Sequence, residues 1–171
     1  MLATHKDAEE RYTKLRLAVL DEINKDLRTS QPNLRAALID QSALSESKRW
    51  KSSTKRRVEW NWTEGYSVFR YRHPKRFEMA LWNNKQLASL SLGRPTYQGT
   101  KLRLDFIEGN PDSAKDIRVF EYTFLAMAGY AEVLDASELR VMNPINASVR
   151  QYYERFGLVY VPKGDYLFVR L

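Results

Sequence analysis

Between residues 77 and 107, apolar and polar side chains alternate, which is the pattern of strands that bury one face in a core. Three segments have this pattern: Phe77–Trp82, Gln86–Leu92 and Lys101–Ile107. Asn83-Asn84-Lys85 is suited to join the first two as a hairpin, and Gly93–Thr100 provides the next turn. The third segment places its apolar side chains on one face, namely Leu102, Leu104 and Phe106. We therefore expect antiparallel strands here.

Helical spacing dominates on either side of these strands. Apolar residues recur every three or four positions over Asp7–Leu27 and from Ala114 to about Leu134, which predicts two long helices. Asn33 is suited to cap a short helix over Leu34–Gln41. Two further segments alternate and are predicted strands, Val58–Trp62 and Tyr66–Arg72. The Ser-rich and basic stretch Ser42–Arg57 is predicted to be an exposed linker.

The last third of the chain predicts a strand, a helix and two strands. Leu139–Met142 alternates and stops at Asn143-Pro144. Asn146 or Ser148 can cap a helix over Val149–Phe156, and Gly157 ends it. The β-rich runs Val159–Pro162 and Tyr166–Leu171 flank a turn at Lys163-Gly164-Asp165.

The string NPINASVRQYYERFGL, residues 143–158, resembles the C-terminal signature of the GNAT acetyltransferase superfamily. That signature is an Asn, a small or apolar residue three positions later, a Tyr seven positions later, and a Gly with an apolar residue that close the helix. The matching residues are Asn146, Val149, Tyr153, Gly157 and Leu158. Positions three and seven residues apart lie on one helix face. The alternative is that Tyr152, Tyr153 and Phe156 are core aromatics and Asn146 is an ordinary cap.

The resemblance implies a fold, a cosubstrate and roles for several residues. The implied fold is an α+β or α/β GNAT-like mixed sheet, mostly antiparallel and flanked by helices, with an N-terminal helix pair, in one domain over residues 1–171. Acetyl-CoA would be the cosubstrate. Asn146 and Val149 would lie along it, and the Tyr153 hydroxyl would protonate the departing thiolate. The family's usual first strand has no candidate before the helix pair, so either Val58–Trp62 takes a corresponding place or the sheet is rearranged.

The segment that should hold the pyrophosphate of coenzyme A departs from the family pattern. The family has an Arg or Gln and two glycines after the central strand, whereas residues 108–116 contain only Gly109. A helix N-terminus still follows, where Ser113 can serve as a cap and Lys115 and Arg118 supply positive charge. Phe106 and Ile107 end the strand and are expected to contact the cofactor. The departure leaves three options, namely weaker coenzyme A binding, a different donor, or a fold without catalysis.

Direct acetyl transfer needs a base close to the attacking amine. Glu108 lies at the end of the central strand and is the predicted base, with Asp105 as the second choice and a surface carboxylate as the other interpretation of Glu108. His5 lies near the N-terminus and His73 precedes Pro74 in a predicted turn, so neither is expected to take part in catalysis. We find no metal-ligand spacing, no Walker-type loop and no dinucleotide fingerprint.

Composition narrows the class further. Hydrophobic residues make up 43% of the 171 residues and aromatic residues 12%, which is typical of a folded chain with a substantial core. The absence of cysteine excludes disulfides, thiolate metal sites and a cysteine acyl-enzyme, so direct transfer is the simpler route. No apolar run approaches the ~20 residues of a membrane span, and no signal segment is present, so we expect a cytoplasmic protein.

The net charge of +7 favours anionic partners, and the excess is concentrated in one segment. Six basic residues there are expected to be exposed: Lys48, Arg49, Lys51, Lys55, Arg56 and Arg57. Tryptophans and further basic residues follow up to residue 76, which would suit phosphate contacts and base stacking. The other interpretation is a solvated basic loop with the tryptophans in the core.

Three classes of function follow. The first is an N-acetyltransferase whose acceptor is an amine of a small molecule, a protein or an aminoacyl-tRNA. The second is a GNAT-like protein that engages nucleic acid through residues 48–76, and the third is a non-catalytic GNAT-fold binding module. No metal and no membrane partner is expected, and a homodimer is an open alternative to a monomer.

Overall fold

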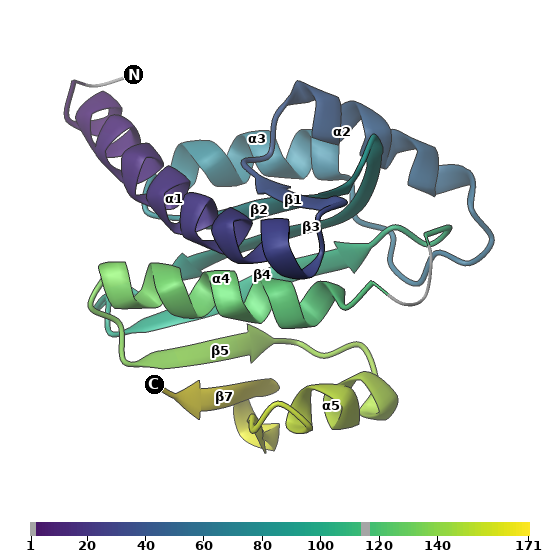
Figure 1. The fold of residues 1–171 in the computed structure, drawn as a ribbon. Coiled ribbons are helices and arrows are strands. Elements are labelled where there is room, and N and C mark those ends of the chain that lie inside the picture. The colour runs from purple at the N-terminus through teal and green to yellow at the C-terminus, as the bar shows by residue number, and fades with distance from the viewer. Residues whose placement is uncertain (1–2, 114–116) are drawn as a thin grey trace.

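A computed structural model describes residues 3–113 and 117–171, and its centre is a seven-stranded sheet (Figure 1). The strand order is β1-β2-β3-β4-β5-β7-β6, and every neighbouring pair is antiparallel except β4 and β5. The strands are β1 (Leu34–Ala37), β2 (Phe77–Asn83), β3 (Gln86–Pro95), β4 (Lys101–Gly109), β5 (Glu138–Met142), β6 (Val159–Val161) and β7 (Tyr166–Arg170). The predicted mixed, mostly antiparallel sheet is confirmed.

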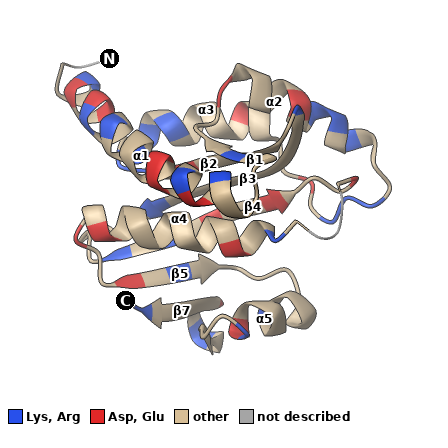
Figure 2. Cartoon of the chain, in the orientation of Figure 1, with Lys and Arg blue, Asp and Glu red and all other residues tan. Residues whose placement is uncertain are grey.

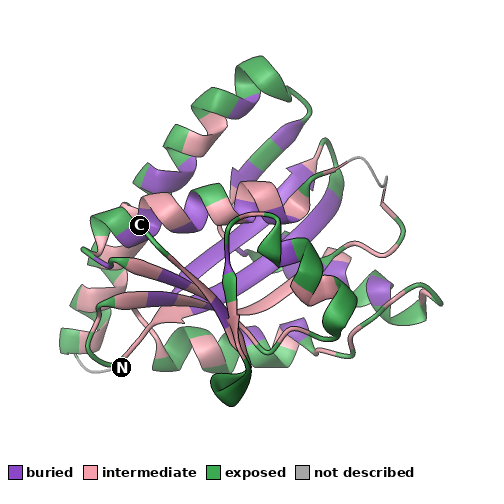
Figure 3. Ribbon diagram, turned by 90° about the horizontal axis from the view of Figure 1, so that it is seen from below, coloured by how far each residue is buried: buried purple, intermediate pink, exposed green. Residues whose placement is uncertain are grey.

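Helices cover both faces of this sheet. They are α1 (Ala3–Ser30), α2 (Gln41–Ser47), α3 (Trp62–Arg72), α4 (Val119–Val133) and α5 (Ala147–Glu154), with 3-10 turns η1 (Lys48–Ser52) and η2 (Pro162–Gly164). Helices α1 and α4 pack on one face around a core that includes Leu20 and Met127, and α2 and α3 pack on the other around Leu44 and Trp62. Figure 3 shows the buried strands between these layers. No helix of the described chain has the length and apolar character needed to cross a membrane.

The predicted elements of the C-terminal third are confirmed, and the reason is local. Asn146 has extended backbone angles and its side-chain oxygen accepts the N–H of Val149 at 2.9 Å, so it caps α5. Gly157 has a positive φ of 86°, which ends this helix at low cost because glycine lacks a Cβ. The predicted hairpin of β2 and β3 is also confirmed, although Asn83 belongs to β2 and the turn is Asn84-Lys85.

The first interpretation that fails is the short helix over 34–41, because this segment contains strand β1. Its four residues pair with β2, with Ala36 opposite Leu81, and the side chain of Asn24 on α1 bonds both the N–H and the C=O of Ala36 at 2.8 Å. Strand pairing thus outweighs a weak local helix signal. The predicted N-terminal helix pair of Asp7–Leu27 and Leu34–Gln41 is therefore wrong, because strand β1 follows α1. Strand β1 is the first strand of the sheet and precedes α2 and α3.

The predicted strands Val58–Trp62 and Tyr66–Arg72 are also wrong. The prediction of an exposed linker without secondary structure over residues 42–57 is wrong as well. Residues 62–72 form α3, which Asn61 caps by accepting the N–H of Glu64 at 3.3 Å. Trp62 and Tyr66 are four residues apart and both are buried, so they lie on one helix face. Residues 41–52 form α2 and η1, where Asp40 caps α2.

Arg76 on the approach to β2 is buried rather than part of a basic surface. Its guanidinium bonds Glu78 at 2.7 Å and Glu9 of α1 at 2.8 Å. The second oxygen of Glu78 accepts the N–H of Ile39 at 2.7 Å, and Tyr66 also donates to this carboxylate. These charge-assisted bonds join α1, α3 and β2.

Strand β4 contains a bulge that changes which way its last residues point. Leu92 of β3 is opposite Phe106, and Gly93 is opposite Leu104, so Asp105 is the extra residue. A Cβ at Gly93 would overlap the carbonyl oxygen of Arg103, so the close approach at the bulge requires glycine. The extra residue turns Phe106 toward the core of α2 and α3, and not to the face of Leu102 and Leu104 that the sequence predicted.

The helix predicted from Ala114 begins later. Residues 114–116 lie outside the described residues, Ile117 and Arg118 are not helical, and α4 begins at Val119. Ser113 is therefore not the cap of α4. Its hydroxyl instead donates to the carbonyl of Asn110 at 3.0 Å, inside the loop that follows β4.

Candidate functional site

The parallel strands β4 and β5 separate partway along the sheet. Their pairing ends at Leu104 and Val141, whereas β4 continues to Gly109 on its other partner β3. The residues of β4 beyond the bulge therefore present backbone groups that no β5 residue bonds. A cavity of about 330 Å³ lies at this opening. We call it the splay cavity.

The lining of the splay cavity brings together residues that are distant in sequence. It includes Asp105–Ile107 of β4, Val141 and Met142 at the end of β5, Asn143–Ile145 after it, and Val58–Trp60 before α3. Helix α5 contributes Val149 and Tyr153. Four of the predicted site residues thus meet here, namely Phe106, Ile107, Val149 and Tyr153.

Other predicted cofactor residues lie apart from this cavity. Asn146 is exposed and caps α5, Ser113 lies in the loop after β4, and Arg118 is exposed with an ion pair to Glu121 at 3.5 Å. None of the three lines the splay cavity. Lys115 lies outside the described residues. Contacts of these four side chains with coenzyme A remain predictions.

Tyr153 is buried in the wall of the splay cavity. Its side chain is 8% exposed and its ring lies 4.3 Å from the ring of Phe120, measured between centroids. Burial, with a smaller contribution from Tyr152, raises the pKa of Tyr153 to about 12. The phenol therefore keeps its proton near neutral pH.

Glu108, the predicted base, is engaged on both carboxylate oxygens. Arg56 donates to Oε2 at 2.7 Å and to Oε1 at 3.0 Å, and the indole of Trp62 donates to Oε1 at 2.8 Å. Glu108 is 6% exposed and is absent from the lining of the splay cavity. The hydrogen bonds to Glu108 raise the pKa of Arg56. The Glu108 carboxylate therefore links β4 to Arg56 and to Trp62 of α3.

Asp105, the second choice for the base, is one of the residues that line the splay cavity. Arg103 donates to Oδ1 at 2.8 Å, while Oδ2 has no hydrogen-bond partner among the described residues, and Arg94 lies 3.8 Å from it. The side chain is 9% exposed. Burial raises the pKa of Asp105, although Arg103 and Arg94 act in the opposite direction. Asp105, with one unbonded and buried carboxylate oxygen, therefore belongs to the lining of the same cavity as Tyr153.

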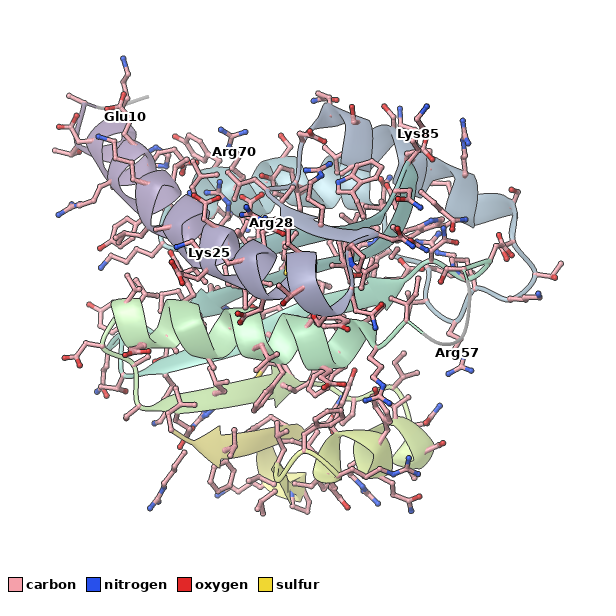
Figure 4. All side chains as sticks on the ribbon, viewed as in Figure 1. Glu10, Lys25, Arg28, Arg57, Arg70 and Lys85 are labelled. Carbon is pink, nitrogen blue, oxygen red and sulfur yellow. The ribbon has the colours of Figure 1, made fainter. Side chains whose placement is uncertain are left out.

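The expectation that all six basic residues are exposed is wrong for Arg56, whose side chain is 10% exposed because it pairs with Glu108. The other five are exposed: Lys48, Arg49, Lys51, Lys55 and Arg57. Figure 2 shows basic residues gathered along this segment, and in Figure 4 Arg57 extends away from the ribbon. Trp50 and Trp62 are buried and cannot stack on bases. Ser53 bonds Asp112 at 2.9 Å, which holds the segment beside the loop after β4.

A second, larger cavity of about 600 Å³ lies between α3 and strands β3 and β4. We call it the aromatic cavity. It shares Glu59, Trp60 and Phe106 with the splay cavity. The sequence did not predict it, because the pattern of residues 66–72 was interpreted as a strand. The helical spacing of Trp62, Tyr66, Phe69 and His73, which all line it, is the signal that could have revealed it.

Comparison with known proteins finds similarity of fold. No family model matches the chain, and neither does any curated protein sequence. Among solved structures, an acetyltransferase from Thermus thermophilus matches with a TM-score of 0.65 and 12% identity, over 81% of this chain and 97% of that one. A variant of spermidine N-acetyltransferase SpeG from Vibrio cholerae matches with a TM-score of 0.61 and 12% identity, over 82% and 95%.

A third match is YncA from Salmonella typhimurium, whose structure contains its cofactor acetyl-CoA. The TM-score is 0.54 and the identity 8%, over 81% of this chain and 94% of that one. The three matches extend over most of this chain and most of each matched chain. This chain therefore has the fold of the GNAT acetyltransferases.

Proposed function

We propose that the protein is an N-acetyltransferase that moves an acetyl group from acetyl-CoA directly to an amine. The observation that carries this proposal is the splay cavity, because its lining includes both Asp105, which has one unbonded carboxylate oxygen, and Tyr153, which has a protonated phenol. The matched structures support it, since they include an amine acetyltransferase and one that holds acetyl-CoA.

The residues of the opening fit an extended pantetheine arm. Beyond Leu104, no strand of residues 3–113 and 117–171 pairs with the edge of β4 that faces β5, so its backbone groups are available to amides. Phe106, Ile107 and Val149 provide the apolar wall. Acetyl-CoA, when bound, supplies an activated thioester carbonyl carbon to this space.

The proton transfers then follow from the two side chains. Asp105 accepts a proton from the ammonium group of the acceptor, which leaves a neutral amine with a lone pair. As the new N–C bond forms and the C–S bond breaks, Tyr153 donates its proton to the sulfur and regains one from the nitrogen. Asp105 then releases its proton to solvent, so one proton is produced for each acetyl group transferred. We therefore propose Asp105, and no longer Glu108, as the general base.

Binding of the cosubstrate is the first test. Acetyl-CoA at a hundredfold excess over Kd is expected to stabilise the fold by about 2.7 kcal/mol, visible as a rise in Tm. Arg118→Glu places a negative charge beside the first turn of α4. If the N-terminus of α4 holds the phosphates of coenzyme A, this variant should show a smaller rise in Tm. Arg28→Glu, an exposed change on α1, is the matched control. No shift at millimolar acetyl-CoA would refute the proposal.

Tyr153→Phe tests the proton donor. The change keeps the ring against Phe120 and removes only the hydroxyl, so unfolding should be little affected. Turnover is expected to fall on the order of 10²-fold, the lower end for general acid catalysis. Full activity in Tyr153→Phe would instead assign the residue to core packing. If the wild type binds acetyl-CoA but acetylates no amine, the protein is a non-catalytic module.

A second candidate function, nucleic-acid binding, is favoured by the five exposed cations of residues 48–57. The variant with Lys48, Arg49, Lys51, Lys55 and Arg57 changed to Gln leaves the Arg56–Glu108 pair in place and should fold normally. For each phosphate that the variant no longer binds, the slope of log affinity against log salt for an oligonucleotide should decrease in magnitude by roughly 0.7–0.9. An unchanged slope would exclude this segment as the binding surface.

A further inference from the structure

The walls of the aromatic cavity are fixed rings. Trp60 packs edge-on against Phe106 at 5.1 Å between centroids, and Phe69 packs edge-on against Phe106 at 6.3 Å. The indole of Trp62 is held by Glu108, and the carbonyl of Trp60 accepts a bond from Arg56 at 2.6 Å. Rings held in this way form a preorganised apolar surface, which suits a flat apolar group of a ligand.

The volume of about 600 Å³ is within the range of small-molecule sites. It can hold a ring system with a short chain. The cavity meets the splay cavity at Trp60 and Phe106, because both residues line both spaces. A ligand in the aromatic cavity can therefore extend one end toward Asp105, the neighbour of Phe106 in sequence.

The lining of the aromatic cavity contains more carboxylates than guanidinium groups, although Arg94 and Arg103 also lie near His73. Its lining includes the carboxylates of Glu59 and Glu64, against one guanidinium, that of Arg72. Burial and nearby arginines lower the pKa of the His73 imidazole, so it is neutral at pH 7. The lining thus has a net charge of −1 in a chain of +7. Glu59 lies where the two cavities meet, and aromatic faces also attract ammonium groups.

We propose that the aromatic cavity is the acceptor site, and that the acceptor is a small primary amine joined by a short linker to an aromatic ring. The ring lies among Trp60, Phe69 and Phe106, and the amine lies at the junction beside Glu59 and Asp105. This inference rests on the proposed acetyltransfer. A polyamine would bring more positive charge than the lining can match, and a carboxylate would meet Glu59 and Glu64.

Gly65 provides a blocking variant that leaves the fold intact. It lines the aromatic cavity in α3, and a Cβ built there has no heavy atom within 4 Å. Leucine is also a better helix former than glycine. Gly65→Leu should therefore narrow the cavity without strain. Ser67→Leu is the matched control, because Ser67 is exposed on the same helix and does not line this cavity.

The experiment measures binding of four probes by calorimetry and by tryptophan fluorescence. The probes are 2-phenylethylamine, butylamine, 3-phenylpropionate and spermidine. We expect 2-phenylethylamine to bind at least about tenfold more tightly than the other three, because it alone combines the buried ring with a single cation. Gly65→Leu should weaken this binding at least about tenfold, whereas Ser67→Leu should not.

Two results would overturn the inference. One is binding of butylamine or spermidine as tight as that of 2-phenylethylamine, and the other is unchanged binding in Gly65→Leu. The acetyl-CoA shift, measured on the same variants, separates this inference from the proposed function, since Gly65→Leu should keep it. If the protein binds 2-phenylethylamine but acetyl-CoA does not raise its Tm, both proposals are overturned. The bound amine would then have no acetyl donor.

Discussion

Asp105→Asn is expected to lower kcat/KM for acetyl transfer on the order of 10³-fold, within the range for loss of general acid–base catalysis. The amide has the size of the carboxyl group and can still accept the bond from Arg103, so the bulge should persist. What it loses is the ability to take a proton at Oδ2. The measurement is release of the coenzyme A thiol with an amine that the wild type acetylates, and an unchanged acetyl-CoA shift is the control for folding. A loss below about threefold would exclude Asp105 as the base.

The pH dependence gives an independent readout of the same residue. Because burial raises the pKa of Asp105 and only its carboxylate form accepts a proton, wild-type kcat/KM should fall as the pH drops through this raised value. This acid limb should be missing in Asp105→Asn. His73 also titrates on the acid side, since its pKa is lowered, but His73→Asn is expected to keep the limb.

The C-terminal half of the fold was accessible from the sequence because its signals are local. Asn146 caps α5 through a bond to a residue three positions away, and Gly157 has the positive φ that it was expected to have. The strands β2 and β3 are joined by the two polar residues Asn84 and Lys85, and Asn84 has a positive φ of 53°. In each case the residues that decide the structure are neighbours in the chain.

Residues 34–72 were misinterpreted because distant partners decide their structure. Four residues of β1 become a strand only because β2 and Asn24 of α1 satisfy their backbone groups. Helix α3 contains Gly65 and several aromatic residues, which gave it an alternating pattern with a weak helical signal. Its cap, Asn61, is the local feature that indicates a helix rather than a strand.

The proposal of Asp105 as the base in place of Glu108 also depends on distant partners. Strict alternation along residues 101–108 assigns one face to every second residue, and the bulge at Asp105 breaks this rule. Gly93, which permits the bulge, lies on another strand. The pairing of Glu108 with Arg56 spans 52 positions of sequence, so no pattern along the chain could indicate it.

Arg56→Met is expected to reduce the free energy of unfolding by about 3 kcal/mol or more, because it leaves the Glu108 carboxylate buried without its cation. Lys55→Met, a neighbouring exposed change, should alter it by less than about 0.5 kcal/mol. Chemical denaturation measures both. A cost under about 1 kcal/mol for Arg56→Met would show that the pair is solvated.

The double variant Arg56→Met, Glu108→Gln separates structure from catalysis. The amide introduced at position 108 can still accept the indole N–H of Trp62, and no charge is left unpaired, so the double variant should regain at least about 1–2 kcal/mol relative to Arg56→Met alone. If Glu108 only holds Arg56 and Trp62 in place on β4, the folded double variant should keep most of its turnover. Its kcat/KM should also still fall at low pH, as in the wild type. If Glu108 is the base, turnover should collapse although stability recovers, and Asp105 would lose the role assigned to it.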